Sequence, residues 1–304
     1  MTATRSLAAV ARTVWLDLGW LVVLVVTLAV PFVLDTLGML TYASSLAFWA
    51  IPILYLFPLF LTLTTADKRL RRALWLTVVP IVVLGVILDF LIGHLTLTFP
   101  GCTLNDGRYV YCLDGRVPVE ELLFYAMGPV AMVLVYAAAD ERWLSAYNPK
   151  DDLVDARLLQ ISPPLVVTAA VAAAALTVVW VVRGTFPTYA VFLTAGAVLP
   201  AVFLYRAVGR FVNWPAFAVT VLYVALTSVI WEVTLAVPRG WWGYEMRGML
   251  GAIGPWSRPE PFPIEAAVVW IAAPFSCVLT YEFAKAFMYH PSPSSRVALR
   301  GRAT

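Results

Sequence analysis

The most regular feature of the sequence is a series of apolar stretches, each about 20 residues long and separated by short polar segments. A helix of about 20 apolar residues crosses the hydrocarbon layer of a bilayer. The pattern therefore predicts about eight membrane-spanning helices, at 15–35, 46–65, 74–96, 118–139, 162–182, 186–207, 214–236 and 264–287. We expect an all-α fold, a polytopic membrane helical bundle.

Composition supports the same class of protein. Of the 304 residues, 62% are hydrophobic and 13% are charged, whereas a soluble domain carries about 25% charged residues. This balance excludes a water-soluble globule and a disordered chain. The net charge of +3 leaves no basic footprint for a nucleic acid. The chain has two His and three Cys and lacks the common nucleotide-binding motifs, so we expect neither a cofactor nor a metal.

The basic residues predict the orientation of the chain. Of the 21 Lys and Arg residues, 15 fall in one set of loops and 6 in the opposite set. Because the more basic loops stay in the cytoplasm, we expect a multi-pass protein of the cell membrane with both termini cytoplasmic. On the outer side, Cys102 and Cys112 flank a turn signal at Asn105-Asp106-Gly107. A disulfide and two free thiols are both compatible with this spacing.

A second regularity is an internal duplication. Pro118-Val119-Glu120 opens the fourth predicted helix, and Pro263-Ile264-Glu265 opens the eighth, 145 residues later. Asp89 in the third span and Glu232 in the seventh are separated by 143 residues. These matching offsets predict two parallel four-helix repeats, at 1–145 and 146–304. Pro followed by an acid is also simply a favourable helix start, but its repetition at matching places weakens that alternative.

Five acidic residues lie in or at the outer ends of the predicted spans: Asp89, Glu120, Glu121, Glu232 and Glu265. Charged groups are costly inside a bilayer and indicate function by default. A carboxyl group without a basic partner is expected to keep its proton there, and it can then act as a general acid. Adjacent helix residues point about 100° apart. The two acids therefore cannot both face one pocket squarely, and because Glu121 matches Ala266 in the repeat, we expect Glu120 to be the more inward of the two.

Other charged residues are interpreted as structural. Asp140 is expected to lie solvated on the linker between the repeats, and Glu282 and Lys285 are spaced for an ion pair along one helix. Three arginines lie in outer loops from which they could reach the acids: Arg116, Arg239 and Arg247.

Aromatic residues gather near the acids in the sequence. The candidate substrate-binding rings are Phe124, Tyr125, Trp231, Trp241, Trp242 and Tyr244. Aromatic belts at the membrane interface have the same composition, and that alternative stays open. The functional interpretation is that ring faces stabilise a carbocation. An acid beside such walls in a lipid-accessible cavity suits the protonation of an alkene and the steering of the resulting cation.

The segment Pro118-Val119-Glu120-Glu121-Leu122-Leu123-Phe124 resembles the Pro-x-Glu-Glu signature of the small integral-membrane lycopene cyclases, which are heterodimeric in bacteria and fused in archaea and fungi. The apolar segments around 86–90 and 228–244, each with an acid, and Trp242-Gly243-Tyr244 are also similar to that family. The sequence departs from the family at Ala266, and at Cys102 and Cys112, where Trp is expected.

The resemblance implies a cofactor-independent lycopene cyclase, an intramolecular lyase of carotenoid biosynthesis that acts on a hydrophobic isoprenoid substrate within the bilayer. Glu120 or Glu265 would protonate the terminal double bond, and the next double bond would attack the resulting cation. Asp89 or Glu232 would then remove a proton and leave an ionone-type ring. The alternatives are a membrane carotenoid hydratase, a cyclase of another terpenoid and, from a different class, a proton- or cation-coupled secondary transporter.

Overall fold

A computed structural model describes residues 2–65, 67–100, 112–113, 117–149, 163–253 and 262–288. Side chains are described from residue 18 onward within these ranges, except those of 88–92, 94 and 112–113. This part of the chain contains eight helical spans long and apolar enough to cross a membrane: Leu18–Thr36, Tyr42–Leu63, Lys68–Ile87, Val119–Trp143, Pro163–Arg183, Thr188–Phe211, Trp214–Ala236 and Ile264–Phe287. The all-α membrane bundle is confirmed, and each predicted span has its counterpart.

The first half of the chain supplies four spans and three short strands. Thr41 caps the second span, because its hydroxyl accepts from the Ser44 N–H while the Ser44 hydroxyl accepts from the Thr41 N–H. The elements are α1 (Thr2–Thr36), α2 (Tyr42–Ser45), α3 (Ala47–Leu63), α4 (Lys68–Ile92), η1 (Gly93–Leu95), β1 (Leu97–Thr98), β2 (Cys112–Leu113), β3 (Val117–Pro118), α6 (Val119–Ala138), η2 (Ala139–Trp143) and η3 (Ser145–Tyr147).

The second half repeats this order. Asn213 caps the seventh span by accepting a hydrogen bond from the Ala216 N–H. The elements are α7 (Pro163–Arg183), α8 (Thr188–Leu193), η5 (Thr194–Val198), α9 (Leu199–Val208), η6 (Gly209–Phe211), α10 (Trp214–Ser228), η7 (Val229–Ala236), β4 (Gly243–Tyr244), η8 (Met246–Gly248), β5 (Ala252–Ile253), β6 (Phe262–Pro263) and α11 (Ile264–Phe287).

The fourth helix of each half begins in the same way. Pro118 and Pro263 are the residues before the first helical turn, and both have an extended backbone. Each closes a short antiparallel ladder, which pairs Cys112 with Pro118 in one half and Ala252 with Pro263 in the other. A proline at this point donates no N–H and cannot extend the helix backward, so both helices start directly after a strand.

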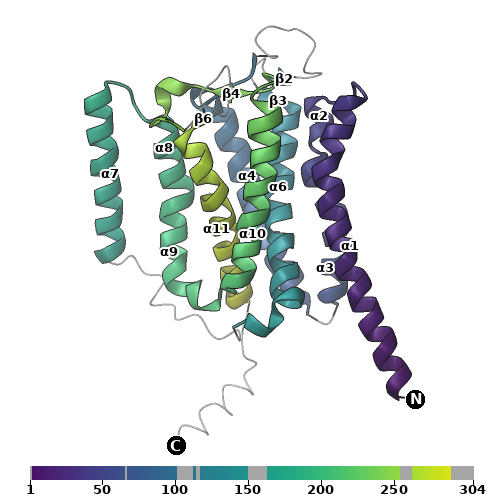
Figure 1. Cartoon of the computed structure of the whole chain (residues 1–304). Helices are drawn as coiled ribbons and strands as arrows, with labels where there is room; N and C mark the ends of the chain where they lie inside the picture. Colours follow the sequence, from purple (N-terminus) through teal and green to yellow (C-terminus); the bar gives the residue numbers. More distant parts are fainter. Residues whose placement is uncertain are drawn as a thin grey trace, which may run out of the picture.

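Helix packing has the correspondence that two repeats require. In the first half α6 packs on α3 and α4, and in the second half α11 packs on α9 and α10. Across the halves, α11 contacts α4 as α6 contacts α10, and α6 contacts α11 directly. The strands lie at one end of the bundle, here called the strand end, and α1 begins and α11 ends at the opposite, terminal end (Figure 1). The boundary between 1–145 and 146–304 stays a prediction.

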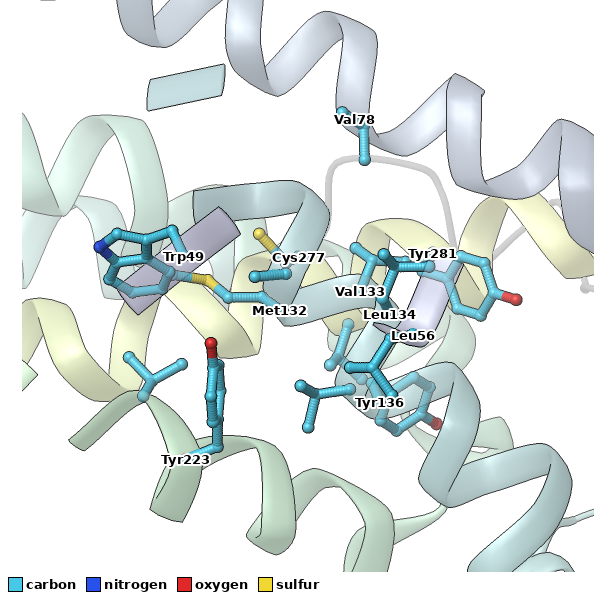
Figure 2. Packing of buried hydrophobic residues seen from close by; sticks show 14 of the residues in the cluster. Trp49, Leu56, Val78, Met132, Val133, Leu134, Tyr136, Tyr223, Cys277 and Tyr281 are labelled. Atoms are coloured by element: carbon cyan, nitrogen blue, oxygen red, sulfur yellow. The ribbon is translucent and has the colours of Figure 1, made fainter. Parts of the chain in front are cut away.

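The centre of the bundle is a tightly packed apolar layer. All residues from Ala131 to Ala139 on α6 and the start of η2 are buried. They contact buried side chains of the surrounding helices, including Trp49, Leu56 and Tyr223 (Figure 2). In contrast, α7 buries none of its residues and stands at the edge of the bundle (Figure 1). A helix that is apolar yet buries nothing is suited to lipid on all sides.

Candidate functional site

Four of the five predicted acids lie buried at the strand end. The exposed fraction is 7% for Glu120, 4% for Glu121, 7% for Glu232 and 2% for Glu265. These carboxyl groups therefore point into the protein and away from lipid and bulk solvent. Asp89 lies on α4, close to its end, but its side chain is outside the described residues.

Glu232 is held by hydrogen bonds to both carboxyl oxygens. Its Oε1 accepts from the Tyr244 hydroxyl, and its Oε2 accepts from the indole N–H of Trp270 at 2.8 Å. A group that accepts at both oxygens has the arrangement of a carboxylate. Glu232 lies in η7, a π-helical continuation of α10, and such segments are frequent at functional sites.

The first turn of α6 buries two adjacent acids. Glu121 accepts a hydrogen bond from the Tyr42 hydroxyl, which ties α6 to α2. Glu120 has a buried Oε2 without a hydrogen-bond partner in the described part of the chain. Both acids are buried, so the structure does not single out Glu120 as the more inward one. Tyr42 of α2 covers the direction in which Glu121 points.

Glu265 occupies the matching turn of α11. Its Oε1 accepts from the backbone N–H of Leu250, and its Oε2 is buried without a partner among the described residues. The loop that carries Leu250 is tied to α7, because the Arg183 guanidinium donates to the carbonyl of Met249. Glu120 and Glu265 thus share one feature, a buried carboxyl oxygen that no described group satisfies.

All six predicted aromatic residues belong to one connected set of rings, the strand-end aromatic cluster. Trp231 is central, with ring centroids 5.0 Å from Phe124 and 5.9 Å from Trp242. Trp242 contacts Tyr244 at 5.4 Å, and Phe124 contacts Tyr125 at 5.6 Å. Trp241 joins the set by stacking on Tyr42, which in turn lies 6.2 Å from Trp231.

Several members of the site were not among the predicted site residues. Tyr42 and Trp49 come from the second span, where Trp49 lies 5.4 Å from Phe124. Ser45 accepts from the Trp231 indole N–H at 2.8 Å. Trp270 contacts Glu232 and so bridges α11 and η7. The sequence feature that could have identified Tyr42 and Ser45 as site residues is their position at the strand-end start of the second span.

Tyr244 holds the Glu232 carboxyl from a strand that pairs with the first half of the chain. Burial, the Glu232 carboxyl and, more weakly, Tyr189 and Glu121 hold the pKa of the Tyr244 phenol well above its usual value. The hydroxyl is therefore a neutral donor at ordinary pH. Its strand β4 pairs with β1, with Leu97 opposite Tyr244, so the backbone of the first half positions a side chain of the second.

Other charged residues differ from expectation. Arg239, one of the arginines that could reach the acids, pairs instead with Asp35 at 2.7 Å. Glu245 caps η8 by accepting from the Arg247 N–H. Asp140, expected to be solvated, is buried at the terminal end because Asn213 and Lys285 approach it from other helices. The Cys102–Cys112 pair lies outside the residues whose side chains are described.

No group of three or more His, Cys, Asp and Glu side chains among the described residues is arranged to hold a metal ion. Comparison with known proteins gives no match to any family model, any curated protein or any solved structure. The site is therefore defined by the geometry of its own residues.

Proposed function

We propose that the protein is a cofactor-independent carotenoid cyclase that forms ionone-type end groups on lycopene by protonation and deprotonation of double bonds. The observation that carries this proposal is the burial of four carboxyl groups at one end of a membrane bundle. Two of them, Glu121 and Glu232, accept hydrogen bonds from tyrosines of the aromatic cluster. The resemblance of the segment from Pro118 to Phe124 to the membrane lycopene cyclases supports the same chemistry.

The first step is donation of a proton to the terminal double bond. Glu120 and Glu265 are the candidate acids, because each keeps a buried oxygen without a partner among the described residues. Positioned general acids contribute about 10²–10⁴-fold to a rate. The remainder of the acceleration comes from folding the chain so that the next double bond lies in attack geometry.

The intermediate is a tertiary carbocation, which needs a dry environment and negative ring faces. Trp231, Phe124 and Trp242 provide such faces in one contiguous group. A cation over an aromatic face gains about 2 kcal/mol or more when desolvated. The indole of Trp231 is fixed by its hydrogen bond to Ser45, so its ring plane is set before substrate enters.

The last step removes a proton from the cyclised cation. Glu232 suits this role, because Tyr244 and Trp270 hold both of its oxygens as acceptors. Asp89 occupies the corresponding span of the first half and is the second candidate. The overall reaction gains one proton and loses one, so it requires no redox partner.

A hydratase is the second candidate function. It shares the protonation step but adds water to the cation. The indole N–H groups of Trp49 and Trp242 are buried without acceptors in the described part of the chain, and both rings contact Trp231. Buried donors of this kind are places for an ordered water. The product distinguishes the two functions.

Secondary transport is disfavoured by the packed centre. A coupled transporter needs a route between the buried acids at the strand end and the opposite face of the membrane. The residues from Ala131 to Val135, the first part of the apolar layer, are buried at this point and carry no polar side chain. The proposed orientation, with both termini cytoplasmic, places the site in the outer half of the membrane.

Expression in cells that accumulate lycopene, followed by pigment analysis, tests the proposal. Products with ionone rings support the cyclase, and hydroxylated open-chain products support the hydratase. Unchanged lycopene, with the protein correctly inserted, would overturn both.

A further inference from the structure

The terminal ends of α6 and α11 meet in a buried polar cluster that lies apart from the proposed site. Lys285 Nζ lies 3.1 Å from Asp140 Oδ2 and 3.0 Å from Glu282 Oε1. The exposed fractions of Asp140, Glu282 and Lys285 are 1%, 0% and 3%. Glu141 is partly exposed and lies 3.8 Å from the same ammonium. Charges this well buried persist only when they are paired and hydrogen-bonded.

Neutral groups complete the cluster. The Tyr136 hydroxyl donates to Glu282 at 2.9 Å and accepts from the Asn213 N–H at 3.1 Å. The Asn213 amide donates to Asp140 at 3.0 Å. The cluster therefore joins α6 and η2 of the first half to α10 and α11 of the second.

The positions of these residues follow the internal repeat. The offset of 145 residues that relates Glu120 to Glu265 also relates Pro129 to Pro274, Tyr136 to Tyr281 and Asp140 to Lys285. Tyr136 and Tyr281 contact each other edge to face with centroids 6.1 Å apart, and Asp140 and Lys285 form the ion pair. Corresponding residues therefore face each other, as they do beside a two-fold axis.

We propose that Asp140 and Lys285 form a pairing code through which the first repeat accepts a second repeat and rejects a copy of itself. If two first repeats paired, Asp140 would face Asp140 in a buried site without Lys285 to neutralise either carboxylate. Burying like charges without compensation is strongly destabilising, which excludes such a pair. In a pair of second repeats each Lys285 would keep its own Glu282, so the code acts against the pairing of two first repeats. The partner that this surface fits is a four-helix repeat with a cation at the position of Lys285.

The code is tested with full-length variants. Asp140→Lys and Lys285→Asp each place like charges at the pair, and we expect the folded yield to fall to about a tenth or less. The double reversal again contains one lysine, one aspartate and Glu282, and we expect it to recover at least half of the wild-type yield. If only the burial of these two side chains mattered, and not their opposite charges, the double reversal would not recover the yield of folded protein. The exposed pair Asp35 and Arg239 is the matched control, and its reversals should leave the yield unchanged.

Co-expression of the two single variants with different tags gives a second measurement. Exchange of repeats between the chains restores both ion pairs, so we expect the two tags to purify together in a folded dimer. Single reversals with wild-type yield would overturn the proposal. The proposal would also be overturned if the double reversal gave no more folded protein than the single variants and the two tags purified separately. These measurements need no substrate, so the result is independent of the proposed cyclase activity.

Discussion

The indole N–H of Trp270 lies 2.8 Å from Glu232 Oε2, so α11 orients a carboxyl group that belongs to η7. The ring of Trp270 is also packed 5.5 Å from Phe262, which fixes the direction of the N–H.

Trp270→Phe removes this donor while keeping an aromatic ring. A hydrogen bond to a charged group contributes about 1.5–3 kcal/mol, which corresponds to about 10- to 100-fold in rate. We expect ring formation from lycopene to fall by that factor, with normal membrane insertion. Trp180→Phe, on the lipid-facing α7, is the control and should retain full activity. Unchanged turnover in the Trp270 variant would remove Glu232 from the proton-accepting role.

Glu120→Gln and Glu265→Gln separate the two candidate acids. An amide keeps the shape of the side chain but has no acidic proton, so we expect the true donor to lose about 10²–10⁴-fold in turnover. Product formation in membranes with matched protein content is the measurement. Glu245→Gln, at the same end of the bundle, is the control. If both variants of the candidate acids stay fully active, neither residue donates the proton.

Tyr244→Phe should change the alkaline stability of the protein. The pKa of Tyr244 is raised in the folded state, so between the unfolded value near 10 and the folded value the native protein binds the proton more tightly. The stability that Tyr244 contributes is present in full below about pH 10 and is lost as the pH rises toward its pKa in the folded protein. We expect the melting temperature of the wild type to fall more steeply above pH 10 than that of the variant. Parallel curves would contradict the assigned environment of Tyr244.

Gly85→Ala tests the close approach of α4 and α6 behind the site. A Cβ atom at Gly85 would lie 2.9 Å from Cδ1 of Tyr125, so the ring must move. Overpacking of this kind costs about 1–3 kcal/mol, and the melting temperature should fall. Gly128→Ala is the matched control, because its Cβ would lie 3.8 Å from the nearest side-chain atom, in Phe124. Equal stability of the two variants would show that Tyr125 is free to shift.

Reporter proteins fused to each terminus test the orientation. The excess of basic residues in one set of loops predicts that both reporters are cytoplasmic and that the strand end lies outside. A fluorescent protein that matures only in the cytoplasm should therefore be bright at either terminus. If the fusions at both ends are dark, the orientation is the opposite one and the acidic site lies on the cytoplasmic side.

The sequence was sufficient for features that depend on local pattern. The spans follow from runs of apolar residues, and the starts of α6 and α11 follow from Pro118 and Pro263. The first-turn positions of Glu120 and Glu265 follow from the same two prolines. Each of these properties is determined by residues within one or two helical turns.

Features that depend on distant contacts were beyond such patterns. Glu121 is buried because Tyr42, 79 residues away, donates to it. The local sequence around Asp140 predicts a solvated linker residue. Its burial depends on Lys285 of α11, which is 145 residues away and donates a hydrogen bond to it. The π-helical turns of η7 change which face carries Trp231 and Glu232, and no residue type at that segment marks the change. Helix periodicity alone cannot indicate which distant side chain completes a hydrogen bond.

The short ladder between β1 and β4 makes the chemistry of one half sensitive to the backbone of the other. Leu97 sits opposite Tyr244, and the Glu245 N–H donates to the Thr96 carbonyl at 3.0 Å. Substitutions in this strand of the first half would reorient the phenol that restrains Glu232, more than 130 residues later in the chain. For the proposed cyclase, we therefore expect substitutions at 96–98 to alter the ratio of products before they alter the amount of folded protein.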